Sequence, residues 1–251
     1  MAKELQINCL SEFIEEVDTF YDSLGYHAGS LWFRGHTKPT YKLIPSVLRQ
    51  AYDENSMIDD FLVNYSTLSE NRISDLWGKY ALMQHYGLPT RLLDWTKSPL
   101  IALYFALLNH DQNSKRVIWA IDPYYLNNKT YNTESVFIPT TYEQELPIKI
   151  YDFLPKALRN SKAIPDYPLA VETPYTNKRI LSQQGCFTVH GTKKATIDSY
   201  FKDAKHIRKF VITGKTKIKN MQNSLFNMGI KEEYVMQDLQ SLSQRIVREH
   251  S

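Results

Sequence analysis

The sequence lacks the features that mark secreted and membrane-spanning proteins. Its two cysteines, Cys9 and Cys186, lie far apart and without metal-site spacing, which argues against a disulfide-stapled domain and favours a reducing compartment. No stretch approaches the roughly 18 apolar residues that a membrane span requires. The first residues include Lys3 and Glu4 and contain no apolar run of signal-peptide length. We therefore expect a soluble cytoplasmic protein without a membrane partner.

Several short motifs that would identify a reaction are also absent. The chain has no P-loop, no GxGxxG turn, no HExxH helix and no paired CxxC. His36, His85, Asp94 and His190 carry possible metal ligands, but nothing in their spacing favours a metal, so no metal site is predicted. His85 and Asp94 could be two members of a hydrolase triad, yet no nucleophile-elbow serine accompanies them.

Length and charge leave most classes of protein open. At 251 residues the chain is long enough for one large domain or two small ones. Its 30 basic and 27 acidic residues give a net charge of +3, which neither requires nor excludes a nucleic-acid partner. Six of the eleven prolines lie between Pro139 and Pro174. We interpret 1–251 as a single domain with a proline-rich insertion, lid or set of short edge strands at about 124–178.

Apolar periodicity predicts a mixture of helices and strands. Spacing at three and four residues predicts helices near 11–24, 53–87 with a break at 69–71, 99–108, 218–228 and 234–247. Ser11 is the expected N-cap and Gly25 the expected C-cap of the first helix. Asp238, Leu239 and Leu242 are the expected docking side of the last helix. Short apolar runs predict strands near 30–35, 90–94, 117–121, 186–190 and 208–213.

The densest group of polar residues lies within 80–106. His85, Arg91 and Asp94 fall within ten positions, and a Gly-Leu-Pro-Thr turn separates the histidine from the other two. A Ser-Pro pair at 98–99 predicts a helix start, where free backbone N–H groups favour an anion. The group fits the wall of a binding or catalytic site, and it fits equally a buried polar network that ties a turn to a helix.

Arg34, at the end of the apolar run 30–35, is a second candidate for a binding-site residue. A buried arginine is costly unless it meets an anion or a carboxylate, and its planar fork suits either a phosphate or a carboxylate. Gly35 allows a ligand or another backbone segment to approach closely. The alternative interpretation is an internal arginine–carboxylate pair.

Three stretches of the chain together match the motifs of one protein family. They are WFRGH at 32–36, QHYGLPTRLLDWTKSPLIALYFA at 84–106 and RILSQQGCF at 179–187. Together they resemble the FRG domain family, which is named for a Phe-Arg-Gly motif. The matching stretches span most of the chain in the family's order.

The order of these motifs is also similar to that of ADP-ribosyltransferases of the Arg–Ser–Glu type. In that family an arginine placed like Arg34 grips the NAD phosphates, and a strand end and helix similar to 94–106 follow. A Glu-x-Glu loop comes last. Gln183 and Gln184 stand where its carboxylates are expected, and glutamine can bind a ribose hydroxyl but cannot stabilise a cation by charge. The missing charge would come from His85 or Asp94.

This resemblance implies an α+β fold with a split, mostly antiparallel sheet and surrounding helices, like that of ADP-ribosyltransferases. It implies NAD as a substrate, no metal, and a macromolecular acceptor that is protein or nucleic acid. The setting would be a toxin or a phage-defence effector.

The resemblance and the polar residues of 80–106 together give the predicted site residues. His85, Asp94 and Gln184 are the predicted catalytic residues. The residues predicted to bind the nucleotide are Arg34, Gly35, His36, Gln84, Arg91, Thr96, Ser98 and Gln183. We expect Arg34, His85, Asp94 and Gln184 to converge on one pocket. Two other functions remain open: a non-catalytic module that binds a nucleotide or a nucleic acid, and a hydrolase of NAD or of a phosphodiester that uses His85 on water.

Overall fold

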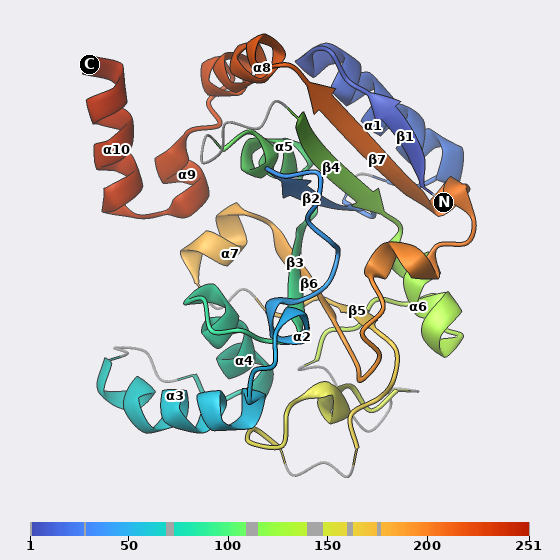
Figure 1. Cartoon of the computed structure of the whole chain (residues 1–251), viewed down its shortest axis with the longest axis vertical. Coiled ribbons are helices and arrows are strands. Elements are labelled where there is room, and N and C mark those ends of the chain that lie inside the picture. The colour runs from blue at the N-terminus through green and yellow to red at the C-terminus, as the bar shows by residue number, and fades with distance from the viewer. Residues whose placement is uncertain are drawn as a thin grey trace.

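The computed structural model describes residues 2–27, 29–68, 73–108, 115–139, 148–159, 163–174 and 177–250. Its centre is a seven-stranded sheet flanked by helices (Figure 1). In spatial order the described strands are β1 (Lys3–Gln6), β7 (Ile207–Thr213), β4 (Lys115–Ile121), β2 (Trp32–His36), β3 (Leu92–Thr96), β6 (Gly185–Val189) and β5 (Leu169–Val171). Strand β1 pairs with β7 in parallel, and the other pairs of neighbouring strands are antiparallel. The predicted α+β class and the mostly antiparallel sheet are confirmed.

The sheet is split between β2 and β3. Strand β2 pairs with β4 over five residue pairs and β3 pairs with β6 over five, but β2 and β3 share only the pair Phe33↔Thr96. The half made of β1, β7, β4 and β2 therefore diverges from the half made of β3, β6 and β5, as their directions in Figure 1 show. Backbone ladder bonds end where the strands separate, so side chains face one another across the opening.

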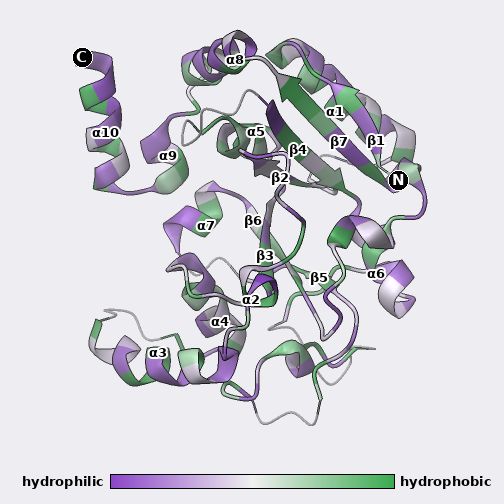
Figure 2. Ribbon diagram, in the orientation of Figure 1, coloured by the Kyte–Doolittle hydropathy of each residue, from purple (hydrophilic) through white to green (hydrophobic). Residues whose placement is uncertain are grey.

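The first half of the sheet packs against α1 (Leu10–Leu24), α5 (Pro99–Leu107) and α8 (Lys215–Asn227). Hydrophobic residues lie along β4 and β7 beneath these helices (Figure 2). Helix α1 buries Leu10, Phe13, Val17 and Phe20, which recur at helical spacing. Gly25 is its left-handed C-cap, as predicted, but its N-cap is Cys9 and not Ser11. The helix begins two residues earlier because Leu10 already belongs to the buried face.

The second half packs against α3 (Glu54–Leu68), α4 (Leu76–His85) and the segment around a 3-10 turn at Ile150–Phe153. The expected helix break at 69–71 lies outside the described residues. Within 124–178, the described parts include most of α6 (Pro123–Tyr131), this turn and β5, whereas residues 140–147, 160–162 and 175–176 lie outside them. The remaining short helices are α2 (Ser46–Arg49), α7 (Lys178–Ser182), Ile197–Tyr200 and Ala204–His206.

The chain ends in two helices where the sequence predicted one. Gln237 adopts a left-handed conformation between α9 (Glu232–Met236) and α10 (Leu239–His250). Helix α10 contacts α9 through the ion pair of Arg245 with Glu233 and that of Arg248 with Glu232. Leu239 is 79% exposed, so it is not part of the docking side as predicted, whereas Leu242 is half-buried.

The close approach of β2 to α5 depends on Gly35. A Cβ atom built at this position would lie 2.0 Å from the carbonyl oxygen of Ala102 and 2.5 Å from the backbone nitrogen of Ala106. Both atoms belong to the α5 backbone, which cannot rotate away as a side chain would. The sequence left open whether a ligand or a backbone segment approaches Gly35, and the structure places a helix there.

We predict that Gly35→Ala destabilises the fold by about 1–3 kcal/mol or more, because β2 must separate from α5 to admit the methyl group. Gly185→Ala is the matched control. Its Cβ would meet the side-chain Cγ2 of Ile180 at 3.2 Å, and that side chain can adjust. Urea unfolding of both variants measures the difference, and equal losses would contradict this role of Gly35.

Candidate functional site

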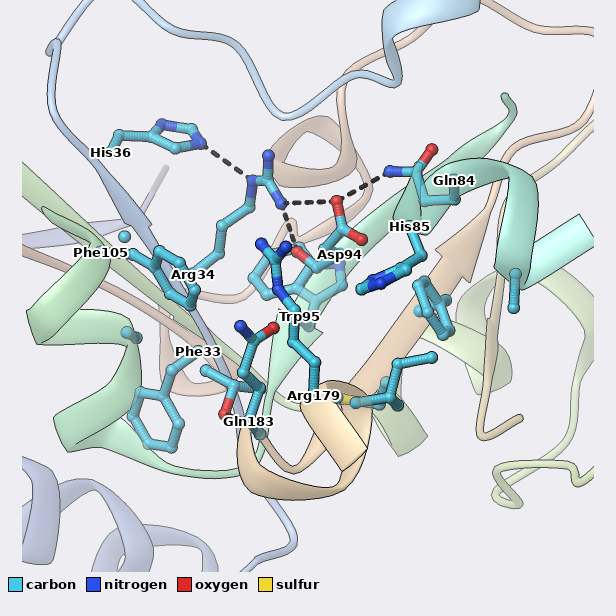
Figure 3. A pocket seen from close by; sticks show the side chains of 18 of the residues that line it. Phe33, Arg34, His36, Gln84, His85, Asp94, Trp95, Phe105, Arg179 and Gln183 are labelled. Atoms are coloured by element: carbon cyan, nitrogen blue, oxygen red, sulfur yellow. Dashed lines mark hydrogen bonds and ion pairs between the residues drawn. The ribbon is translucent and has the colours of Figure 1, made fainter. Parts of the chain in front are cut away.

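The split between β2 and β3 opens into a pocket of about 350 Å³. Its lining residues come from both halves of the sheet and from α4, α5 and α7 (Figure 3). Phe33, Trp95, Phe105 and Phe187 supply aromatic surface, and polar side chains converge from several directions. A small-molecule site typically has this volume and combines apolar walls with a few placed polar groups.

Arg34 projects from β2 into this opening. Its Nε donates to His36 Nε2 at 3.1 Å, and its Nη1 donates to the backbone oxygen of Asp94 and lies 3.6 Å from Asp94 Oδ2. Among the described residues Nη2 has no hydrogen-bond partner, and the side chain is 22% exposed. Burial lowers the pKa of Arg34 and Asp94 opposes this, yet a guanidinium stays charged. Two of its nitrogens are thus held by the protein, while the third is left for a ligand or water.

Asp94 is held from two sides. Gln84 Nε2 donates to Asp94 Oδ2 at 2.8 Å, on the oxygen that also faces Arg34. Thr90 Oγ1 donates to Gln84 Oε1 at 2.6 Å and so fixes which end of the amide points at the carboxylate. The Asp94 side chain is nevertheless 53% exposed. Its position is therefore set by the protein while much of its surface faces the pocket and solvent.

The two histidines of the site are both shifted toward the neutral form. Burial, followed by the charges of Arg34 and Arg49, lowers the pKa of His36 to about 3. His36 Nε2 accepts from Arg34, which requires a neutral ring. Burial, followed by the charge of Arg179, lowers the pKa of His85, although Asp94 opposes the shift. At neutral pH both imidazole rings are therefore uncharged, so each can accept a proton as a base but neither can act as an imidazolium acid.

Eight of the eleven residues selected from the sequence line the pocket: Arg34, Gly35, His36, Gln84, His85, Asp94, Thr96 and Gln183. Thr96 also has a structural task, because its Oγ1 donates to the backbone oxygen of Gln183 at 2.6 Å and accepts from the backbone nitrogen of Ser98. It ties the end of β3 to the turn before β6.

The other three selected residues lie elsewhere. Arg91 Nε donates to Glu54 Oε2 at 2.7 Å, and its Nη1 donates to the backbone oxygen of Gly191. Arg91 therefore forms an ion pair inside the protein and does not line the pocket. Ser98 caps α5, as predicted, by accepting from the backbone nitrogen of Ile101. Gln184 occupies a left-handed turn with φ of 47°. Ser98 and Gln184 both line a second hollow of about 520 Å³ beside α1 and not this pocket.

Several pocket residues were not selected from the sequence. Arg179 is the most prominent, since it brings a second arginine to the pocket from α7 (Figure 3). Its side chain forms no hydrogen bond or ion pair with the described residues. Arg179 is the first residue of the RILSQQGCF motif, and its place in that motif was the one feature of the sequence that could have indicated a role at the site. Tyr41 and Phe105 also line the pocket.

The chain is therefore an α+β protein with a ligand-sized pocket at the split of its sheet. Residues 29–115 match the family model of the FRG domain. The match runs from before β2 to the start of β4 and includes Arg34, Gln84, His85 and Asp94, whereas Arg179 and Gln183 lie beyond it. No curated protein and no solved structure matches the chain significantly.

Two further observations concern the described residues alone. They contain no group of three or more histidine, cysteine, aspartate or glutamate side chains that could hold a metal ion. No helix among them has both the length and the apolar character needed to cross a bilayer.

We predict that stability falls on acidification between about pH 6.5 and pH 3. His36 and the buried His190, which follows β6, both have pKa values lowered by burial from 6.5 to about 3. The unfolded chain therefore binds more protons than the folded chain across this interval, so lowering the pH favours unfolding. Each group contributes a slope of up to about 1.4 kcal/mol per pH unit. Urea unfolding at a series of pH values measures it.

His190→Leu should make this pH dependence shallower, because the variant removes one of the two titrating groups. His27→Gln is the control, since His27 is exposed. An unchanged slope in His190→Leu would contradict the assignment.

Proposed function

We propose that the pocket binds NAD and that the chain transfers ADP-ribose from NAD to a macromolecular acceptor. The observation that carries the proposal is the anchored Arg34, whose Nε and Nη1 are fixed by His36 and Asp94 while Nη2 is left for a ligand. A preorganised guanidinium can bind a phosphate oxygen without first ordering a flexible chain.

Charge in the pocket supports an anionic ligand. Among the described lining residues Arg34 and Arg179 are cations and Asp94 is the one carboxylate, so the lining is net positive when both histidines are neutral. Two arginines suit the two phosphates of a dinucleotide, since each can make charge-assisted bonds to phosphate oxygens. The aromatic walls suit its flat rings. The resemblance to ADP-ribosyltransferases, which rests on the order of the sequence motifs, points to the same ligand.

Asp94 would serve the bond-breaking step. The bond between ribose C1′ and the nicotinamide nitrogen breaks with its electron pair leaving on nicotinamide, and positive charge develops on the ribose. A fixed carboxylate stabilises that charge. The acceptor's oxygen or nitrogen then bonds to C1′ and gives up a proton. His85 would take that proton, because its lowered pKa keeps the imidazole neutral and basic near pH 7.

A second candidate is a non-catalytic nucleotide-binding module. It is favoured by the state of Asp94, which already faces the cation of Arg34 and an amide of Gln84 and is thereby partly neutralised. A third, a hydrolase, would use His85 to activate water. Nicotinamide release from NAD separates the three: release that requires a cell lysate supports transfer, release in buffer alone indicates hydrolysis, and no release despite NAD binding indicates a binding module.

We predict that Arg179→Ala weakens NAD binding about tenfold or more, which is about 1.4 kcal/mol. Its side chain has no partner among the described residues, so the variant should keep the melting temperature of the parent. Lys178→Ala is the matched control, because Lys178 is an exposed cation on the same helix that does not line the pocket. Isothermal calorimetry measures both, and equal affinities in the two variants would rule out a phosphate contact by Arg179.

We predict that His85→Gln lowers the rate of transfer about a hundredfold or more while the protein still folds. In the parent, activity should stay level from neutral pH to below 6.5 and then decline, since the base is lost only when the lowered pKa is passed. Circular dichroism at each pH confirms that the protein is folded. A variant that melts much earlier but keeps its activity per folded molecule would make His85 structural.

A further inference from the structure

The mouth of the pocket is bordered by the segment between β2 and α2. Thr37 and Tyr41 of this segment line the pocket, and the next residue, Lys42, is exposed. Arg49, at the end of α2, is exposed as well, and its charge helps to lower the pKa of both Arg34 and His36. Cations of this segment thus extend the positive charge of the pocket onto the surface beside it.

Arg49 is oriented and not merely close. Its Nε donates to the backbone oxygen of Ile44 at 3.1 Å, which fixes the stem of the side chain. Its Nη1 and Nη2 make no hydrogen bond with the described residues. A guanidinium that is held at Nε and open at the other two nitrogens is arranged to meet a phosphate outside the pocket.

Two exposed tyrosines each lie against a histidine that lines the pocket. Tyr86 is 72% exposed, and its ring lies edge-on to that of His85, with 4.9 Å between the centroids. Tyr41 is 45% exposed, and its ring lies 5.8 Å from that of His36. Exposed aromatic rings within a positively charged surface are the side chains on which the unpaired bases of a single strand stack.

We propose that the acceptor is single-stranded nucleic acid, with phosphates along Lys42 and Arg49 and a base stacked on Tyr86. This inference rests on the proposed transfer and names its acceptor. The stacked nucleotide would present a hydroxyl or amine next to His85: this atom bonds to ribose C1′, its proton passes to His85, and nicotinamide leaves with the electron pair of the broken bond. A strand is favoured over a duplex because a base or sugar must reach a recessed pocket.

Fluorescence anisotropy with labelled 12-nucleotide single strands of DNA and RNA, without NAD, tests the surface. The double variant Lys42→Gln/Arg49→Gln should weaken binding and should reduce the slope of log K against log salt by about 1.4, at about 0.7 for each lost phosphate contact. The control Lys215→Gln/Lys219→Gln removes the same charge from the exposed side of α8, away from the pocket, and should leave the slope unchanged.

Stacking is tested separately. Tyr86→Ala should weaken binding about fivefold or more, whereas Tyr86→Phe, which keeps the ring, should bind like the parent. The inference is overturned if the parent does not bind the strands, if both charge variants lose affinity equally, or if a duplex or polyglutamate binds as well as the single strand. The last result would indicate an unspecific attraction of anions or an acidic protein partner.

The two proposals fail in different ways. Calorimetry with NAD does not depend on the oligonucleotide, so a parent that ignores NAD but binds strands with the predicted pattern refutes the transfer and upholds the surface. Binding of NAD together with loss of the predicted pattern refutes the nucleic-acid acceptor alone. Transfer of radiolabel from NAD to the strand would support both.

Discussion

The contact of Arg34 with the backbone of Asp94 joins the two halves of the sheet. The backbone ladder between β2 and β3 consists of one residue pair, and beyond it a guanidinium takes the place of a backbone donor at the carbonyl of Asp94. A side chain can span a widening gap that a backbone N–H cannot. The split therefore stays open enough to form a pocket, yet its edge is not left as an unsatisfied carbonyl. The residue that closes the sheet is also the one that faces the ligand space.

A chain of polar contacts extends from this point in both directions. On one side Arg34 reaches His36, and on the other Asp94 reaches Gln84 and through it Thr90. Each link constrains the next, because a neutral His36 can accept from Arg34 whereas a protonated ring would repel it. Such a network is costly when any member is lost, since the remaining groups are left without partners. Its cost is a reason to expect that the orientation of Arg34 and Asp94 serves a ligand, as the proposed function requires.

Local patterns in the sequence predicted much of the fold. Apolar spacing located α1, α5 and five of the seven described strands, but not β1 or β5, and the Ser-Pro pair at 98–99 identified the start of α5. Residues that line the pocket were found where arginine, histidine and aspartate stood beside apolar runs. The role of Arg91 was not visible, because its partner Glu54 lies 37 residues earlier and only the fold brings them together. Arg179 has no partner among the described residues and sits on a short helix without a strong pattern. The left-handed turn at Gln184 decides that Gln183, and not its neighbour, lines the pocket, and sequence spacing cannot show this.

In the proposed function Arg34 binds a phosphate while it also supports the sheet. Measuring the ratio of the affinity for NAD to that for nicotinamide riboside, which lacks both phosphates and the adenosine, in the parent and in Arg34→Lys tests this role. Lysine keeps the charge but cannot hold His36, Asp94 and a phosphate at once, and the ratio is insensitive to partial loss of folded protein. We predict that the parent prefers NAD by about tenfold or more and that the variant loses most of this preference. Equal affinities in the parent, or an undiminished preference in the variant, would contradict it.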